Sequence, residues 1–320
     1  MKICIVLWAL SISIAFQYQA CEKSSTEEVV KRNDHEIFLI RGAEGGEAFK
    51  VPLNEALKNW QEVAARAGLR CRTFSDKNSR KNIISMLQSF QKPSSTVAWV
   101  VYLGHGTYIN HVPKLNLVGE DITADEMFKH LDTCQRPLIF INCSSSSAPF
   151  LSKLSAPGRV IISATRTGGQ KYYTKFNEMM ATAIANPKAD LDKDGQVSLF
   201  ESYLFASRQV SHFYVGEGRV PGETALLDDN GDKLGVKAEY FRGLTAINPD
   251  KKLDGILSHQ VHLIPSEIET KMSQELRKKR NILEMKLHQL KLEKLQMDEK
   301  EYYKKLEEVL KKIAKIYKTD

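Results

Sequence analysis

Short runs of consecutive apolar residues, each closed by glycine or a small polar residue, constrain the fold of this chain more than any other feature. Residues 97–103 run directly into Gly104, and residues 137–141 run into Asn142. Apolar runs of this length without strict alternation are typical of strands buried on both faces of a parallel sheet. Two further runs of this kind lie at residues 37–40 and 160–164, and residues 69–74 are expected to form another strand.

Helical patterns separate these runs. Amphipathic segments are expected at residues 54–67, 79–90 and 147–154, and Thr123-Ala-Asp-Glu126 is a capping box that opens a helix ending near residue 131. Strands that alternate with helices predict parallel pairing and helices on both faces of the sheet. The expected fold class is therefore α/β, a three-layer sandwich with a mostly parallel sheet.

The N-terminus has the pattern of an export signal. Lys2 precedes an apolar stretch at residues 3–16, which is too short to span a bilayer. Two endings remain open: lipid attachment at Cys21, or simple cleavage near Ala15. Residues 1–20 are thus assigned to a signal peptide or lipoprotein signal and residues 21–35 to a polar leader. We expect an exported protein that is periplasmic, in the cell envelope or secreted, with membrane attachment if Cys21 is lipidated.

The two remaining segments differ in character. Residues 36–250 carry the alternating strands and helices, whereas residues 265–320 form a charged, leucine-rich tail with no glycine, and with no proline after Pro265. Apolar residues in the tail recur at spacings of four and three, which predicts a long helix or a helical hairpin with a coiled-coil seam. Self-association through residues 265–320 and packing back onto the main domain are both compatible with this pattern.

Composition excludes some functions. The net charge of +7 is modest, and the tail contributes part of it with 15 basic and 11 acidic residues. Aromatic residues are not interleaved with a basic stripe, so no nucleic-acid partner is expected. Five cysteines do not form a recognisable disulfide framework. Free thiols in an exported protein favour a chemical role for at least one of them, and no organic cofactor is expected.

Two residues that are typical of nucleophilic catalysis follow two of the predicted strands. His105 follows residues 97–103, and Cys143 follows residues 137–141. The carboxyl ends of parallel strands meet at one edge of a sheet, where ligands bind. An imidazole near a thiol provides the thiolate that nucleophilic attack requires. The amides of Gly106 and Cys143 are candidate oxyanion donors, and the small polar residues 144–147 predict a helix N-terminus that would lower the thiol pKa.

With these residues in place, the chain resembles the clan of caspase-like (clan CD) cysteine peptidases, and within it the legumain-type family. The resemblance lies in Val100-Val-Tyr-Leu-Gly-His-Gly106 and Leu138-Ile-Phe-Ile-Asn-Cys-Ser-Ser145. The strand at residues 160–165 is similar to the strand that follows the family's nucleophile. The similar region covers residues 36–242.

The resemblance implies a caspase-haemoglobinase fold and cysteine endopeptidase activity on a peptide or protein substrate. It implies Cys143 as the nucleophile of a thioester acyl-enzyme, His105 as general base and then acid, and Gly106 as an oxyanion donor.

The substrate pocket is less well defined by the resemblance. The family often has an acidic or amide residue two positions before the cysteine, where this chain has Ile141, so no preference for Asn or Asp is carried over. Arg41 and Asn142 are candidates for the pocket wall, and a surface salt bridge is the alternative role for Arg41.

A separate motif predicts a metal site. Residues 190–201 fit an EF-hand loop: Asp190, Asp192 and Asp194 stand at positions 1, 3 and 5, the carbonyl of Gln196 at position 7 and bidentate Glu201 at position 12. Oxygen ligands at this spacing favour Ca²⁺ in a structural role, with regulation of activity as a further hypothesis. The alternative is a plain acidic turn. Five other histidines form no recognisable ligand set: His111, His130, His212, His259 and His262.

A second function class is compatible with the sequence. The chain could be a non-catalytic, calcium-stabilised surface module that recruits partners through its coiled coil. Selective reactivity of the Cys143 thiol would distinguish the enzyme from the module.

Overall fold

The computed structural model describes residue 32, residues 34–248 and residues 254–318. The export signal at 1–20, the candidate lipidation site Cys21 and most of the leader at 21–35 lie outside the described residues, so these predictions stay untested. None of the described helices has the length and apolar character needed to cross a membrane.

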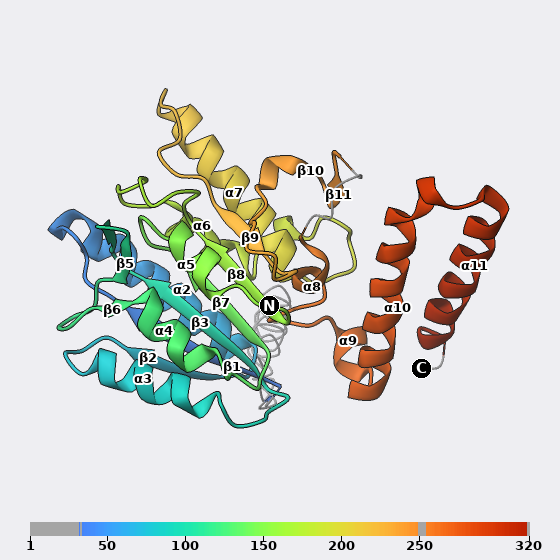
Figure 1. The fold of residues 1–320 in the computed structure, drawn as a ribbon, viewed down its shortest axis with the longest axis horizontal. Coiled ribbons are helices and arrows are strands. Elements are labelled where there is room, and N and C mark those ends of the chain that lie inside the picture. The colour runs from blue at the N-terminus through green and yellow to red at the C-terminus, as the bar shows by residue number, and fades with distance from the viewer. Residues whose placement is uncertain (1–31, 33, 249–253, 319–320) are drawn as a thin grey trace, which may run out of the picture. The chain divides into compact units, whose positions relative to one another are not determined.

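A six-stranded sheet forms the centre of the domain (Figure 1). Its order is β2-β1-β3-β7-β8-β9, and its first five strands are parallel while β9 runs antiparallel to β8. The strands are β1 (His35–Arg41), β2 (Arg70–Phe74), β3 (Val97–Leu103), β7 (Leu138–Asn142), β8 (Arg159–Ser163) and β9 (Leu226–Asp228). The predicted α/β class with a mostly parallel sheet is confirmed.

Helices cover both faces of the sheet because alternate residues of each central strand point to opposite sides. On β7, Ile139 and Ile141 belong to one core, whereas Leu138 and Phe140 belong to the other. The first core is covered by α2 (Lys50–Arg66), α6 (Phe176–Ala183) and α7 (Leu199–Gly216). The second is covered by α3 (Ser79–Ser89), α4 (Ala124–Leu131) and α5 (Ala148–Leu154).

The starts of two of these helices can be compared with the expectations from sequence. The predicted capping box is present, with the Thr123 side chain accepting from the Glu126 amide and the Glu126 carboxylate accepting from the Thr123 amide. Helix α2 begins four residues before the expected position 54, because Pro52 is tolerated in a first helical turn where its missing N–H is not needed.

Two small β-sheets and several 3₁₀ turns lie outside the main sheet. A three-stranded antiparallel sheet of β4 (Gly106–Ile109), β5 (Val112–Leu115) and β6 (Ile122–Thr123) begins immediately after His105. Two-residue strands β10 (Phe241–Arg242) and β11 (Thr245–Ala246) form a hairpin. Single 3₁₀ turns are η1 (Glu47–Phe49), η2 (Pro187–Ala189) and η3 (Ala238–Tyr240).

The C-terminal segment contains a helical hairpin rather than one long helix. Short helices α8 (Ile256–His259) and α9 (Glu267–Lys271) lead into α10 (Gln274–Leu292), η4 (Lys294–Gln296) and α11 (Glu299–Ile316). The Asp298 side chain caps α11 by accepting from the amides of Lys300 and Glu301, which starts the second helix after the turn. Tyr302, Val309 and Ile316 recur every seven residues and are buried.

Candidate functional site

The His105 loop lies at the carboxyl end of β3 and packs tightly on the segment that follows β7. A Cβ at Gly106 would lie 2.4 Å from the Ser145 carbonyl oxygen and 2.5 Å from Ser144 Oγ, so this close approach requires glycine. The His105 amide donates to the Ala43 carbonyl at 2.8 Å, which fixes the loop on its other side. The segments after β3 and after β7 therefore lie together at the carboxyl edge of the sheet, as the sequence predicts.

The side chain beside the imidazole is Ser145. Its Oγ lies 3.1 Å from His105 Nδ1, donates to the Gly106 carbonyl at 2.9 Å and accepts from the Gly106 amide at 3.3 Å. Burial lowers the pKa of His105, which favours the neutral imidazole over the protonated one. Ser145 itself is 2% exposed. Sequence analysis did not single out this serine, although it lies in the polar segment 144–147.

Cys143 is at the predicted strand end, but its side chain faces the core. It continues the alternation of Ile139 and Ile141 and is 1% exposed within the α2–α6–α7 core. Burial raises the pKa of the Cys143 thiol, and the nearby charge of Glu223 raises it further. Among the described residues, the sulfur makes no hydrogen bond to His105. The structure therefore brings the two segments together without bringing the thiol to the imidazole.

The main chain of Cys143 is also fully engaged. Its amide donates to the Tyr102 carbonyl at 3.1 Å, and its carbonyl accepts from the Thr174 hydroxyl. Helix α5 begins only at Ala148, so Cys143 does not stand at a helix N-terminus as the polar residues after it suggested. Neither the predicted oxyanion donation by this amide nor the predicted dipole effect on the thiol fits this geometry.

The two pocket candidates are occupied by local contacts. The Arg41 guanidinium pairs with Glu44 at 2.7 Å and donates to the Gly42 carbonyl and to Asn54 Oδ1, which agrees with the alternative role of an ion pair. Asn142 is fully buried and its Oδ1 accepts from the amide and the hydroxyl of Ser144 at 3.1 and 2.6 Å. The Asn142 Nδ2 group is buried and has no hydrogen-bond partner among the described residues, so its free donor lies inside the domain.

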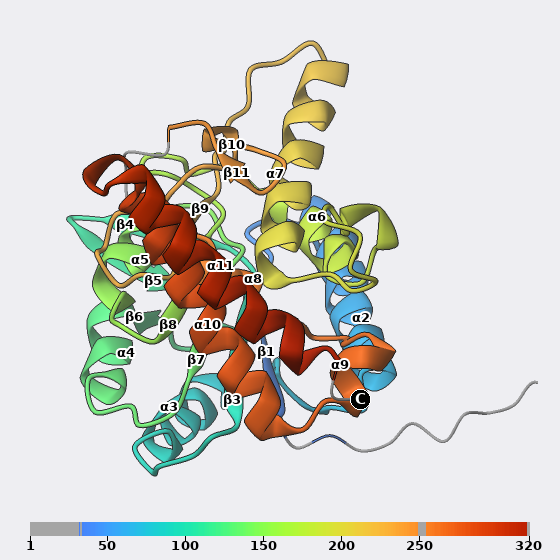
Figure 2. The ribbon, with the colours of Figure 1, turned by 90° about the vertical axis from the view of Figure 1, so that its right-hand side faces the viewer.

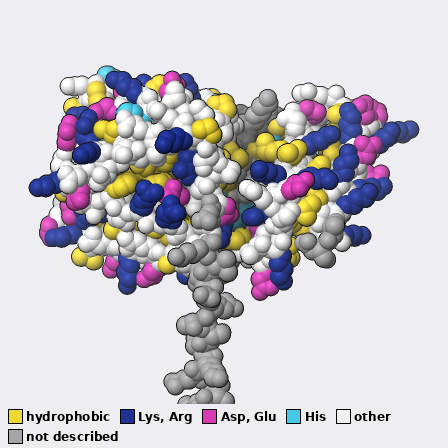
Figure 3. All heavy atoms as spheres, turned by 90° about the horizontal axis from the view of Figure 1, so that it is seen from below, with side chains coloured by type: hydrophobic (Ala, Val, Ile, Leu, Met, Phe, Trp, Pro, Cys, Tyr) yellow, Lys and Arg dark blue, Asp and Glu magenta, His cyan; other side chains and the backbone are white. Residues whose placement is uncertain are grey.

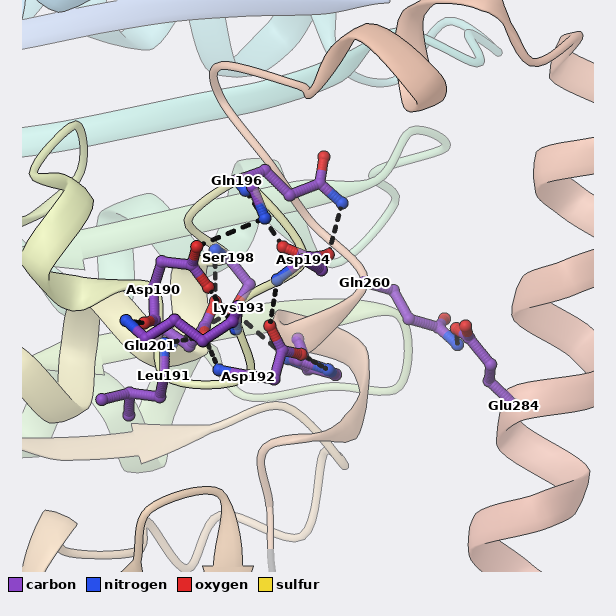
Figure 4. Close-up of polar contacts among 12 residues, drawn as sticks. Asp190, Leu191, Asp192, Lys193, Asp194, Gln196, Ser198, Glu201, Gln260 and Glu284 are labelled. Carbon is purple, nitrogen blue, oxygen red and sulfur yellow. Dashed lines mark hydrogen bonds and ion pairs between the residues drawn. The ribbon is translucent and has the colours of Figure 1, made fainter. Parts of the chain in front are cut away.

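The acidic loop between η2 and α7 has the arrangement expected of a cation site (Figure 4). Carboxylate oxygens of Asp190, Asp192 and Asp194 all lie within 4.8 Å of one another. The loop turns at Lys193 and Gly195, whose φ angles are 64° and 87°. Burial, together with the charges of Glu201 and Asp194, raises the pKa of Asp192. Three carboxylates held this close repel one another, and a divalent cation would relieve that repulsion.

Glu201 does not join the three aspartates. One of its oxygens accepts from the amides of Leu191 and Asp192, and the other accepts from the amide and the hydroxyl of Ser198. This carboxylate is the N3 partner of the capping box that starts α7. The predicted bidentate position 12 is therefore turned toward main-chain donors, and Gln196 contributes a side-chain bond to Asp194 Oδ2 at 2.8 Å.

Residues 259–266 lie along this loop, a contact that sequence analysis missed. His259 lies 3.5 Å from Asp192 Oδ2 and 3.3 Å from Ser198 Oγ. Two main-chain amides add to this contact. The Leu199 amide donates to the Val261 carbonyl, and the Ser266 amide donates to Gln196 Oε1. Next to this contact, Gln260 Nε2 donates to the Asn281 carbonyl and to Glu284 of α10, as Figure 4 shows for Glu284. The acidic loop is thus connected to the C-terminal hairpin.

Comparison with known proteins gives structural neighbours only. No family model matches the chain, and no curated protein matches it. Among solved structures, caspase-1 from Spodoptera frugiperda is 10% identical, with a TM-score of 0.44 over 63% of this chain and 88% of that one. The Drosophila initiator caspase Dronc is 12% identical, with a TM-score of 0.45 over 68% of this chain and 89% of that one. Both of these structures are caspases, and neither is a legumain.

Proposed function

We propose that this chain is a calcium-stabilised module that binds protein partners, and that Cys143 does not act as a thiolate nucleophile in it. The observation that carries the proposal is the convergence of the three aspartates at positions 1, 3 and 5 of an EF-hand-type loop. The loop holds the start of α7 and is bonded to residues 259–266, so an ion here would strengthen the connection between the domain and its C-terminal helices. A buried thiol with a raised pKa supports the non-catalytic assignment.

The residues present fit Ca²⁺ better than a softer metal. Asp190, Asp192 and Asp194 supply hard carboxylate oxygens, and the Gln196 carbonyl stands at the seventh position of the motif. Glu201 would complete the set by leaving Ser198, whose own hydroxyl would still cap α7. Bound Ca²⁺ would supply positive charge at the point where the acidic loop meets residues 259–266.

Calorimetric titration with Ca²⁺ tests this proposal. We expect binding with a dissociation constant between about 1 µM and 1 mM, and its loss in Asp190→Asn. The matched control is Asp232→Asn, which neutralises an exposed aspartate in a separate acidic segment, residues 228–232, and should leave binding unchanged. Absence of binding at millimolar Ca²⁺ would exclude the metal site, as would equal binding by Asp190→Asn.

A peptidase-type hydrolase is the second candidate, favoured by the 3.1 Å contact between His105 Nδ1 and Ser145 Oγ. This distance is within the reach of a nucleophile and its base, but the single hydroxyl hydrogen of Ser145 would have to leave the Gly106 carbonyl before the imidazole could take it. In the form predicted from sequence, a legumain-type cysteine endopeptidase, the Cys143 thiol would have to leave the core before it could attack a peptide carbonyl. His105 would take the thiol proton and later protonate the leaving amine, and water would release the acyl group.

Active-site probes distinguish these candidates. Labelling of Cys143 by a peptidyl acyloxymethyl ketone that disappears in His105→Ala would establish the thiol enzyme, and labelling of Ser145 by a fluorophosphonate would establish a serine enzyme. The module predicts neither, with Cys143 alkylated by iodoacetamide no faster than Cys71 and Cys134. Both of those thiols are half-buried, so they are an internal reference.

Export remains part of the proposal. A positively charged start followed by an apolar stretch at residues 3–16 supports it. Cell fractionation combined with fatty-acid labelling of the chain and of Cys21→Ser separates lipid attachment from simple secretion.

A further inference from the structure

A cavity of about 610 Å³ lies where the parallel strands begin, at the edge of the sheet opposite to His105. One side of it is formed by the starts of β1, β3, β7 and β8, and the other side by residues 257–281. Figures 1 and 2 show α10 as the helix of the hairpin that lies next to the sheet, with α11 outside it. Cavities of this size hold small organic ligands.

The cavity has an apolar wall. Val97, Leu138 and Val160 contribute to it from the starts of three neighbouring strands. Leu257 and Val261 add apolar side chains from the C-terminal segment. A hydrocarbon group that bound against these side chains would be removed from water, which is favourable.

The two acidic side chains of the cavity already have partners. Asp34 accepts two hydrogen bonds from Arg32, at 3.1 and 2.8 Å. Both carboxylate oxygens of Glu269 accept from the Arg280 guanidinium. Neither carboxylate therefore needs a further cation from a ligand.

Two cations near the start of α10 are not paired in this way. Arg277 lies 3.9 Å from Asp34, and its Nε has no hydrogen-bond partner among the described residues. Lys278 forms no ion pair within the part of the chain that the structure describes. Both side chains line the cavity, so both can pair with an anionic group there. Figure 3 shows Lys and Arg side chains among hydrophobic ones on the surface of the C-terminal helices.

The two histidines of the cavity add no charge to it. Burial lowers the pKa of His35 and of His262 to about 4. Each imidazole is therefore neutral near pH 7, and the unpaired positive charge comes from the Arg277 guanidinium and the Lys278 ammonium group.

We propose that this cavity binds an organic carboxylate with a hydrocarbon body, that is, a fatty-acid-like molecule. The hydrocarbon would lie against the strand starts, and the carboxylate would pair with Arg277 and Lys278. The bound molecule would contact both the sheet and the C-terminal helices, and it would thus strengthen their association. This inference does not depend on the calcium site.

Calorimetric titration of the full chain with octanoate tests the proposal, in the presence of a chelator so that Ca²⁺ does not bind the ligand. We expect a dissociation constant on the order of 0.1–1 mM. Octanamide has the same hydrocarbon body without the charge and should bind at least about tenfold more weakly. Acetate has the charge without the body and should not bind at millimolar concentration. Absence of octanoate binding, or equal binding of octanoate and octanamide, overturns the proposal.

A pair of charge-removing variants on α10 tests the carboxylate position. Arg277→Gln should weaken octanoate binding about tenfold, because it removes a charged partner of the carboxylate. The matched control is Lys286→Gln, which removes one positive charge from an exposed position of the same helix outside the cavity and should leave binding unchanged. Circular dichroism confirms that both variants remain folded. An equal effect of the two variants, or no effect of Arg277→Gln, contradicts the assignment.

Photocross-linking tests the location of the hydrocarbon body. An octanoate analogue that carries a diazirine should label peptides from residues 137–160 and 257–281, and excess octanoate should suppress this labelling. Labelling confined to the exposed apolar side chains of α11 would show nonspecific adsorption and overturn the cavity assignment.

Discussion

At the scale of single residues, the direction of one side chain decides how the candidate site is interpreted. Cys143 was predicted to face a crevice because it follows an apolar strand, yet it keeps the inward phase of Ile139 and Ile141. The alternation can be seen in the sequence, but the residue at which it ends cannot. In the structure the main chain turns only after Cys143, so the Cys143 side chain still points into the core. Ser146, with a φ of 53°, marks that turn. The position of His105 was predictable from its flanking glycines, whereas the choice of Ser145 as its neighbour required the fold.

Replacing Cys143 separates a packing role from a catalytic one. We expect Cys143→Ala to lower the free energy of unfolding by about 1 kcal/mol and Cys143→Ser by about 1–3 kcal/mol, because serine would bury a hydroxyl where the structure offers an apolar environment. Urea unfolding monitored by tryptophan fluorescence measures both. Equal stability of Cys143→Ser and the unsubstituted chain would contradict the buried placement.

Glu223 makes stability depend on pH. Burial raises its pKa to about 7, although the amides of Lys175 and Phe176 and the Tyr214 hydroxyl donate to its carboxylate. The folded chain therefore binds more protons than the unfolded chain between pH 4.5 and 7. The stability conferred by this group is fully present below pH 4.5 and is lost as pH rises through about 7.

We expect the free energy of unfolding to contain a component of about 1–3 kcal/mol that declines over this pH range. Urea titrations at pH 5, 6, 7 and 8 measure it, and Glu223→Gln should flatten the curve because glutamine does not titrate. An unchanged slope in Glu223→Gln would assign the pH dependence to other groups.

At the scale of elements, long apolar runs were more predictable than short strands. All five parallel strands and the capping box before α4 follow from sequence patterns and capping chemistry. Strands β4 to β6 and β9 have two to four residues each, too few for an alternating pattern to stand out. The EF-hand spacing located Asp190, Asp192 and Asp194, but the role of Glu201 in the α7 cap is set by the tertiary structure.

Calcium should tighten the contact between the acidic loop and residues 259–266. The amides of Leu199 and Ser266 bridge these segments, so their exchange with solvent reports its opening. We expect saturating Ca²⁺ to slow both exchange rates about tenfold, which corresponds to roughly 1.4 kcal/mol, and to leave amides in β3 unchanged. Hydrogen exchange by mass spectrometry with and without chelator checks this, and identical rates would remove the coupling.

At the scale of the whole molecule, the layered architecture follows from the alternation of strands and helices, whereas the hairpin does not. A seam with spacings of four and three is equally compatible with one long helix and with two short ones. The break lies between η4 and Asp298, where the side chain caps a new helix. The amphipathic pattern therefore predicted helical structure. The cap at Asp298 divides it into two helices.

Both borders of the main sheet are protected against further strand pairing. On β2, Arg70 and Arg72 are exposed and both pair with Glu36 of the neighbouring strand. On β9, Leu227 exchanges amide and carbonyl hydrogen bonds with Val236 at 3.0 and 2.8 Å, which closes its outer side. Charged side chains and short, covered borders are how natural sheets avoid aggregation. Fibrous association by strand addition is thus disfavoured in the native molecule, even in concentrated solution.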